Sequence, residues 1–176
     1  MKRITFLLAM ILVIALLCGI PSAAAAGKSK KEFATTSGEA FSKYMTEEDY
    51  IFTYEGTYEN DDGSEEDEFF ISFEAENMDS IDIEVFFDSD NEGAVFYVWD
   101  YVKFNAKQYD EMQEICNQMN NDYRFAKFYV EDDNTVTVQG DAIFFGNDIG
   151  EICECFICTI ASIADNVYPA FEEALG

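Results

Sequence analysis

The 176-residue chain contains no histidine and only 10 lysines and arginines, and both shortages exclude classes of function. Without an imidazole there is no Ser-His-Asp or Cys-His catalytic group, no histidine-bound zinc and no histidine pH switch. The 36 acidic residues give a formal charge of −26, the wrong sign for binding DNA or RNA. Glycine-rich phosphate loops are also missing. A pair of catalytic carboxylates of the glycoside hydrolase kind cannot be recognised, because among 36 acids some pair will lie at any separation. We therefore expect no catalytic residue, no cofactor and no nucleic-acid partner.

The first 26 residues have the three parts of a secretory signal peptide. Lys2 and Arg3 precede an uncharged run of 17 residues at 4–20, and small residues follow at 22–26. We predict cleavage between Ala26 and Gly27. An uncleaved anchor is the alternative, although the run is near the lower limit for spanning a bilayer. Lipoprotein processing at Cys18 is a third reading, disfavoured by Leu17. The expected product is secreted or extracytoplasmic, without membrane association once the signal is removed.

The mature chain has the composition of one compact acidic domain. Removing the signal leaves 8 bases against all 36 acids, a formal charge of −28. Hydrophobic residues make up 49% and aromatic residues 16%, too many for a disordered acidic tail. A chain of about 150 residues can bury a single core without cross-links. We expect a flexible basic leader at 27–36 and one domain at 37–176.

Hydrophobic periodicity predicts an α+β domain. A helix is expected from Ser37, and a second at 106–122 with an apolar stripe of Tyr109, Met112, Cys116, Met119 and Tyr123. Strands are expected at 50–58, 68–75, 81–87 and 94–104, and a hairpin at 124–131 and 135–143. The last helix begins with a capping box of Asp148 and Glu151 and is expected to break at Pro169. Its predicted inner stripe is Ile149, Cys153, Phe156, Ile160, Ile163 and Val167. The order α-ββββ-α-ββ-α indicates a twisted antiparallel sheet flanked by helices.

The second half of the mature chain resembles the YbjN family, whose members are often labelled sensory transduction regulators. The resemblance rests on YVWDYVK at 97–103 leading into a helix with CNQMNN at 116–121. The hairpin RFAKFYVEDDNTVTVQGDAIF at 124–144 and the helix DIGEICECFICTIASIADNVYPAF at 148–171 complete it. None of these motifs is catalytic, so the resemblance depends on their order. The antiparallel strands expected before residue 97 (a meander) agree with the family only in their pattern.

The resemblance implies a fold similar to the chaperones of type III secretion, in which an exposed surface captures a segment of another protein. It implies no enzymatic activity and transfers no catalytic residue. Family members are commonly thought of as cytoplasmic, whereas this chain begins with an export signal, so a cytoplasmic regulatory role is in doubt here. The additional strand in the first meander leaves the edge of the sheet unassigned.

Four cysteines remain after the signal is removed, and three of them lie close together in the last helix. Cys153 points with the core stripe, whereas Cys155 and Cys158 lie on the far side, so the three cannot converge on one metal. Their C-x-x-C pair lies within the helix and not at its N-terminus, unlike a thioredoxin site. We interpret them as packing residues. In an oxidising compartment, Cys116 and Cys153 are the favoured disulfide partners, offered as a hypothesis, because both face inward.

Two acidic loops could hold calcium, although neither matches a complete binding loop. Asp88 to Gly93 has oxygen-bearing residues at the first, third and fifth positions and glycine at the sixth, but Trp99 occupies the place of the bidentate glutamate. A hairpin turn is therefore the preferred interpretation. The run from Asp61 to Glu68 is expected to be a solvated loop. No metal ligand is assigned in either loop.

The preferred hypothesis is an exported, non-catalytic YbjN-like module with a regulatory or chaperone-like role. Its sheet, rich in phenylalanine and tyrosine and framed by acids, would bind a protein or peptide segment that is cationic or amphipathic. Homodimerisation is a further expectation left open. The alternative is an acidic extracytoplasmic protein that binds calcium through residues 59–68 and 88–93 or serves a structural purpose.

Overall fold

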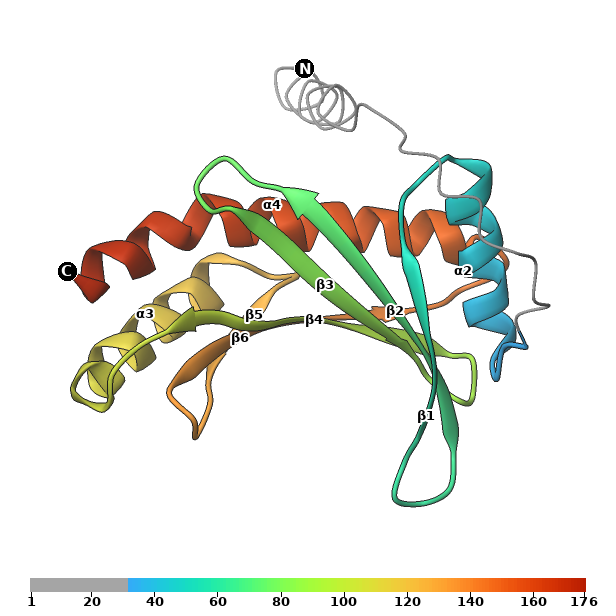
Figure 1. Ribbon diagram of the computed structural model, residues 1–176, viewed down its shortest axis with the longest axis horizontal. Coiled ribbons are helices and arrows are strands. Elements are labelled where there is room, and N and C mark those ends of the chain that lie inside the picture. The colour runs from blue at the N-terminus through green and yellow to red at the C-terminus, as the bar shows by residue number, and fades with distance from the viewer. Residues whose placement is uncertain (1–31) are drawn as a thin grey trace. The chain divides into compact units, whose positions relative to one another are not determined.

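The computed structural model describes residues 32–176, which form a six-stranded sheet with three α-helices (Figure 1). The elements follow the order α-ββββ-α-ββ-α, so the predicted α+β class is confirmed. Their bounds are α2 (Thr36–Glu47), β1 (Thr53–Glu59), β2 (Glu65–Glu74), β3 (Ser80–Phe87), β4 (Gly93–Lys103), η1 (Ala106–Gln108), α3 (Tyr109–Asp122), β5 (Lys127–Val130), β6 (Thr135–Ile143) and α4 (Ile149–Leu175).

All neighbouring strands of the sheet are antiparallel, in the order β1-β2-β3-β4-β6-β5. The first four strands form the predicted meander. Strand β6 lies beside β4, which places β5 and β1 at the two edges that the sequence left unassigned. The two edges differ: β1 carries a bulge between Tyr54 and Gly56. In β5, the backbone of Phe128 pairs with the amide side chain of Asn120 from α3. A bulge in one edge strand and a side chain bonded to the backbone of the other both discourage edge-to-edge aggregation.

The sheet has one covered face and one open face. In β3, Ile81, Ile83 and Val85 are buried, while Asp82 and Glu84 point to the other side. Cross-strand partners share a face, so the registers carry this alternation through the sheet. Helix α4 packs against β3, β4 and β6, with α2 beside its start and α3 beside its later turns (Figure 1). We call the side of the sheet that carries Glu84 and Tyr97 the open face.

The predicted break of the last helix at Pro169 is wrong, because α4 continues to Leu175. Proline cannot donate to the carbonyl four residues earlier, which here belongs to Asp165. The side-chain Nδ2 of Asn77, in the β2–β3 loop, donates to that carbonyl at 3.1 Å. The backbone N–H groups of Glu76 and Asn77 also donate to the Asp165 carboxylate. The helix therefore passes through the proline where a loop distant in sequence supplies the missing donor.

The start of α4 also differs from the prediction. Asp148 is the residue before the helix, but its side chain forms no capping hydrogen bond, so the capping box with Glu151 is absent. The buried stripe shares Cys153, Ile160 and Val167 with the predicted one. Its other members, however, are Gly150, Ile157, Ala164 and Phe171, while the predicted members Ile149, Phe156 and Ile163 are only half-buried. The buried face is rotated because α4 packs against both the sheet and the neighbouring helices.

Strand β2 begins at Glu65, so the predicted loop at 61–68 is shorter than expected. Asp67 belongs to the covered face and is completely buried. Its carboxylate accepts hydrogen bonds from the N–H of Ala34, from the N–H and hydroxyl of Thr35, and from the hydroxyl of Tyr54. Thr35 in turn caps α2 through Gly38 N–H. The last residues of the predicted flexible leader are thus fixed to the sheet, and its earlier residues lie outside the described part of the chain.

Candidate binding surface

The open face of the sheet carries a row of aromatic side chains contributed by three strands. We define the aromatic row as Tyr58 of β1, Phe86 of β3, and Tyr97 and Trp99 of β4. The ring centroids of Tyr58 and Phe86 are 6.3 Å apart, and those of Phe86 and Tyr97 are 6.0 Å apart, both edge to face. Tyr97 and Trp99 stack with centroids 4.1 Å apart and planes at 14°. Tyr58 is 52% exposed and Trp99 45% exposed, so the row presents apolar area to solvent.

A bulge in β4 determines where the row ends. The register between β4 and β6 shifts between Val98 and Val102, and Asp100 has a φ of +51°. As a result Trp99 and Asp100 are both exposed, while Tyr101 is buried. The Tyr101 hydroxyl donates to the carbonyl of Ala164 at 2.6 Å. The bulge therefore anchors β4 to α4 and leaves Trp99 on the open face.

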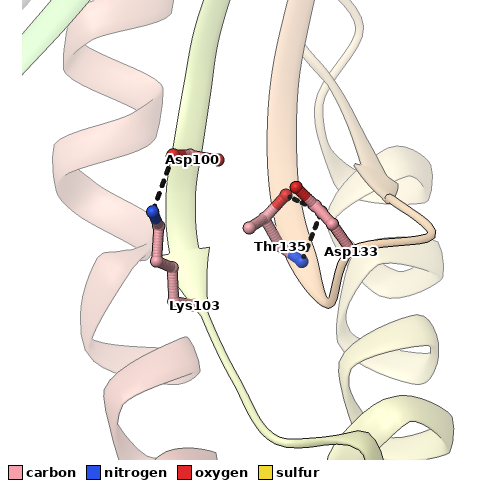
Figure 2. Close-up of polar contacts among 4 residues, drawn as sticks. All are labelled: Asp100, Lys103, Asp133 and Thr135. Carbon is pink, nitrogen blue, oxygen red and sulfur yellow. Dashed lines mark hydrogen bonds and ion pairs between the residues drawn. The ribbon is translucent and has the colours of Figure 1, made fainter.

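Polar contacts support the strand ends next to this bulge. Figure 2 shows Lys103 Nζ at 2.8 Å from the carboxylate of Asp100. This hydrogen bond, with Asp133 as a weaker electrostatic contribution, raises the pKa of Lys103. The Oδ1 of Asp133 accepts from the N–H and hydroxyl of Thr135, closing the β5–β6 turn (Figure 2). Lys103 is therefore paired with an acid of its own strand.

Carboxylates surround the aromatic row. The register places Glu84 opposite Tyr97 and Glu66 opposite Tyr58, and Trp99 Nε1 donates to Glu84 at 2.8 Å. Glu68, Asp82 and Asp141 lie on the same face. Within residues 32–176 none of these acids forms an ion pair, since the two ion pairs there are Lys43–Glu47 and Lys103–Asp100. The surface combines exposed rings with negative charge that this domain does not neutralise.

Burial and neighbouring acids raise the pKa values of two groups on this face. Burial, followed by Glu84 and Glu55, raises the pKa of Glu68. Burial, followed by Asp141 and Glu66, raises the pKa of Tyr97. Lys127 could offset this charge, but its ammonium donates to the carbonyls of Asn120 and Tyr123 at the end of α3. Both Lys103 and Lys127 are thus engaged in other contacts of the domain.

The four cysteines of the described residues differ in their exposure. Cys116 and Cys153 are buried thiols, and burial raises the pKa of Cys116 to about 12 and that of Cys153 still further. Thiols of this kind are poor nucleophiles at neutral pH. Cys155 is exposed and Cys158 half-buried. The Cys116–Cys153 bridge is not formed in the structure and stays a prediction for the oxidised protein.

The two acidic loops are turns of hairpins. Asp88 to Gly93 joins β3 to β4, with Asn91 at a φ of +63°, as the preferred turn interpretation requires. The side-chain oxygen of Asn91 accepts from the N–H of Ser37 and the hydroxyl of Thr36, so it is committed to the start of α2. No group of three or more acidic or cysteine side chains able to hold a metal occurs within residues 32–176. The calcium alternative gains no support from their arrangement.

A second polar cluster was missed by the sequence analysis. Glu154 of α4 accepts hydrogen bonds from the hydroxyls of Tyr44 and Tyr50. This bonding, then burial, raises the pKa of Tyr44, whereas burial is the first cause for Tyr50. A Cβ at Gly150 would lie 2.2 Å from Tyr44, so only glycine lets α2 approach α4 this closely. The three half-buried side chains join α2 and the segment after it to α4.

The predicted signal cleavage between Ala26 and Gly27 lies outside the described residues. Within residues 32–176, no helix is both long and apolar enough to cross a bilayer.

Comparison of the chain with known proteins gives a match to a protein family. No curated protein matches the chain at a significant level. A family model does match residues 42–173, from within α2 to the last turn of α4, and its description reads "Putative bacterial sensory transduction regulator". It covers three quarters of the chain, including the meander that agreed only in pattern. The chain therefore belongs to the YbjN family.

Proposed function

We propose that this YbjN-family protein is an exported, non-catalytic regulator that binds a cationic, amphipathic segment of another protein on the open face of its sheet. One observation carries the proposal. The three helices cover one face of the sheet. The other face exposes an aromatic row among carboxylates that form no ion pair with the bases of residues 32–176. Aromatic anchors provide the apolar contact area, and the charge attracts cationic partners and repels acidic ones.

The same charge disfavours two copies of the domain meeting through this face. Each copy would bring Glu66, Glu68 and Glu84 against their equivalents, and like charges brought together in this way oppose association. A homodimer through the open face would therefore require a bridging cation or high salt. A basic partner requires neither, and its binding weakens as salt is added.

The test is a pull-down from the native secretome with the mature protein at low and high salt. Wild type is compared with the double variant Tyr58→Ala/Trp99→Ala, which removes two exposed rings of the aromatic row. Tyr109→Ala, an exposed tyrosine on α3, is the matched control. We expect a basic protein to be retained by wild type and the control at low salt and lost by the double variant. Retention of no partner at either ionic strength, or equal retention by all three proteins, contradicts the proposal.

Export has its own test. N-terminal sequencing of the mature product should begin at Gly27. An intracellular product that retains residues 1–26 would refute export and leave binding by the open face to be decided by the pull-down.

A further inference from the structure

One end of the aromatic row has the chemistry of a cation site. Tyr97 and Trp99 stack on one another, and Glu84 lies directly across from Tyr97 on β3. The indole N–H of Trp99 donates to one carboxylate oxygen of Glu84 at 2.8 Å. This hydrogen bond holds the carboxylate beside the indole ring, so an aromatic face and a negative charge are presented together.

The two neighbouring bases of this chain do not occupy the site. Lys103, four residues after Trp99, is bound to Asp100 across the bulge, as Figure 2 shows. Lys127, which lies in the same cross-strand row as Tyr97 through Gln139, reaches around the sheet edge to the carbonyls of α3. Within residues 32–176, neither of these two neighbouring bases therefore supplies a cation beside Trp99.

We propose that Trp99, Tyr97 and Glu84 form a subsite for an arginine side chain of the bound segment, an inference that rests on the proposed function. A guanidinium group is planar and can stack on the exposed indole while its N–H groups bind the carboxylate of Glu84. A lysine ammonium is a compact, strongly hydrated charge and cannot do both as well. The subsite would thus discriminate arginine from lysine, whereas the charge around it attracts both.

Trp99 is the single tryptophan of the chain, so its fluorescence reports on this subsite alone. The experiment titrates the mature protein with three labelled peptides that alternate leucine with arginine, lysine or citrulline. Peptide anisotropy measures affinity, and tryptophan emission measures contact with the subsite. We expect the arginine peptide to bind about fivefold or more tightly than the citrulline peptide, and more tightly than the lysine peptide. We also expect only the arginine peptide to change the emission strongly.

Variants assign the effect to named side chains. Glu84→Gln keeps an oxygen that can accept the Trp99 N–H but removes the charge, and it should abolish the preference for arginine over lysine while the other acids of the face still favour both over citrulline. Glu114→Gln removes the same charge from an exposed position on α3 and should leave the preference unchanged.

The outcomes separate this inference from the proposed function. If arginine and lysine peptides bind equally and Glu84→Gln has no larger effect than Glu114→Gln, the arginine subsite is refuted while binding to the open face survives. If no basic peptide binds wild type at low salt, binding by the open face and the subsite are both refuted.

Discussion

At the scale of single residues, the buried carboxylate of Asp67 connects segments of the chain that are distant in sequence. Four donors from two distant segments converge on it: the N–H groups of Ala34 and Thr35 and the hydroxyls of Thr35 and Tyr54. A buried carboxylate is tolerated only when hydrogen bonds replace its lost hydration. Asp67 therefore fixes the segment before α2 to the sheet and, through Thr35, the first turn of that helix.

Replacing Asp67 tests this role. Asp67→Ala leaves two backbone N–H groups and a buried hydroxyl without their acceptor, and we expect the free energy of unfolding to fall by about 2–4 kcal/mol. Urea denaturation monitored by circular dichroism measures the change. Asp82→Ala, which removes an exposed acid bonded to Ser72, is the control and should cost less than about 1 kcal/mol. Equal stability of the two variants would contradict the assignment.

The buried position of Asp67 could be predicted from the sequence, but most of its hydrogen-bond donors could not. Asp67 has the same parity as Phe69 and Ile71, so strict alternation puts it on the covered face. Its donors in Ala34 and Thr35 lie more than 30 residues earlier, and no local pattern pairs residues so far apart. The same holds for Asn91, predicted as a turn residue, whose contact with the start of α2 depends on the completed fold.

At the scale of elements, α4 is built through its proline with help from the β2–β3 loop. Pro169 leaves the carbonyl of Asp165 without its helical donor, and Asn77 supplies one. Local rules place a helix break at proline because they consider only the helix itself. Strands such as β3 were predictable because alternation is a local property and the meander turns are short. The continuation of α4 past Pro169 depends on a tertiary contact, so it could not be predicted from the local sequence.

A double-mutant cycle measures this dependence. Asn77→Ala should lower the free energy of unfolding by about 0.5–1 kcal/mol in wild type, because the Asp165 carbonyl loses its donor. In a Pro169→Ala background the new N–H at position 169 can satisfy that carbonyl, so the cost of Asn77→Ala should shrink. Chemical denaturation of the four proteins gives the coupling energy. Equal costs in the two backgrounds would mean that Asn77 does not compensate for the proline.

At the scale of the whole molecule, folding concentrates negative charge that is barely offset. Residues 32–176 hold all 36 acids and only five bases, of which Lys103 and Lys127 are engaged near the sheet. Burial, followed by Asp90, raises the pKa of Asp88, and burial, followed by Glu84, raises that of Glu68. Self-repulsion of this kind destabilises the compact state while keeping it soluble.

The sign of the pH dependence follows from these shifts. A carboxyl whose pKa is raised by folding binds its proton more tightly in the folded state. Its stabilising contribution is complete below the unfolded pKa of about 4 and is lost as pH rises through the folded pKa. Lowering the pH from 7.5 to 5 should therefore raise the melting temperature, by about 2–4 °C for each kcal/mol gained. The pKa of Asp62 is lowered, first by its hydrogen bond with Ser64, so its contribution acts the other way, below about pH 4.

Thermal melting across pH and salt checks this prediction. Added NaCl should raise the melting temperature at pH 7.5 and have less effect at pH 5, because screening and protonation relieve the same repulsion. Calcium chloride at matched ionic strength is the control, since a specific calcium site would add stabilisation beyond screening. A melting temperature that is lower at pH 5 than at pH 7.5 would refute the assignment of Asp88 and Glu68 as destabilising charges.

The central claim is that the open face of the sheet receives a cationic segment, and an NMR titration with the arginine–leucine peptide tests it most directly. We predict saturable shifts of side-chain and backbone signals at Tyr58, Phe86, Tyr97 and Trp99, weakened by salt, with little change along α4. Shifts confined to the helices, or none at low salt with peptide in excess, would contradict the claim.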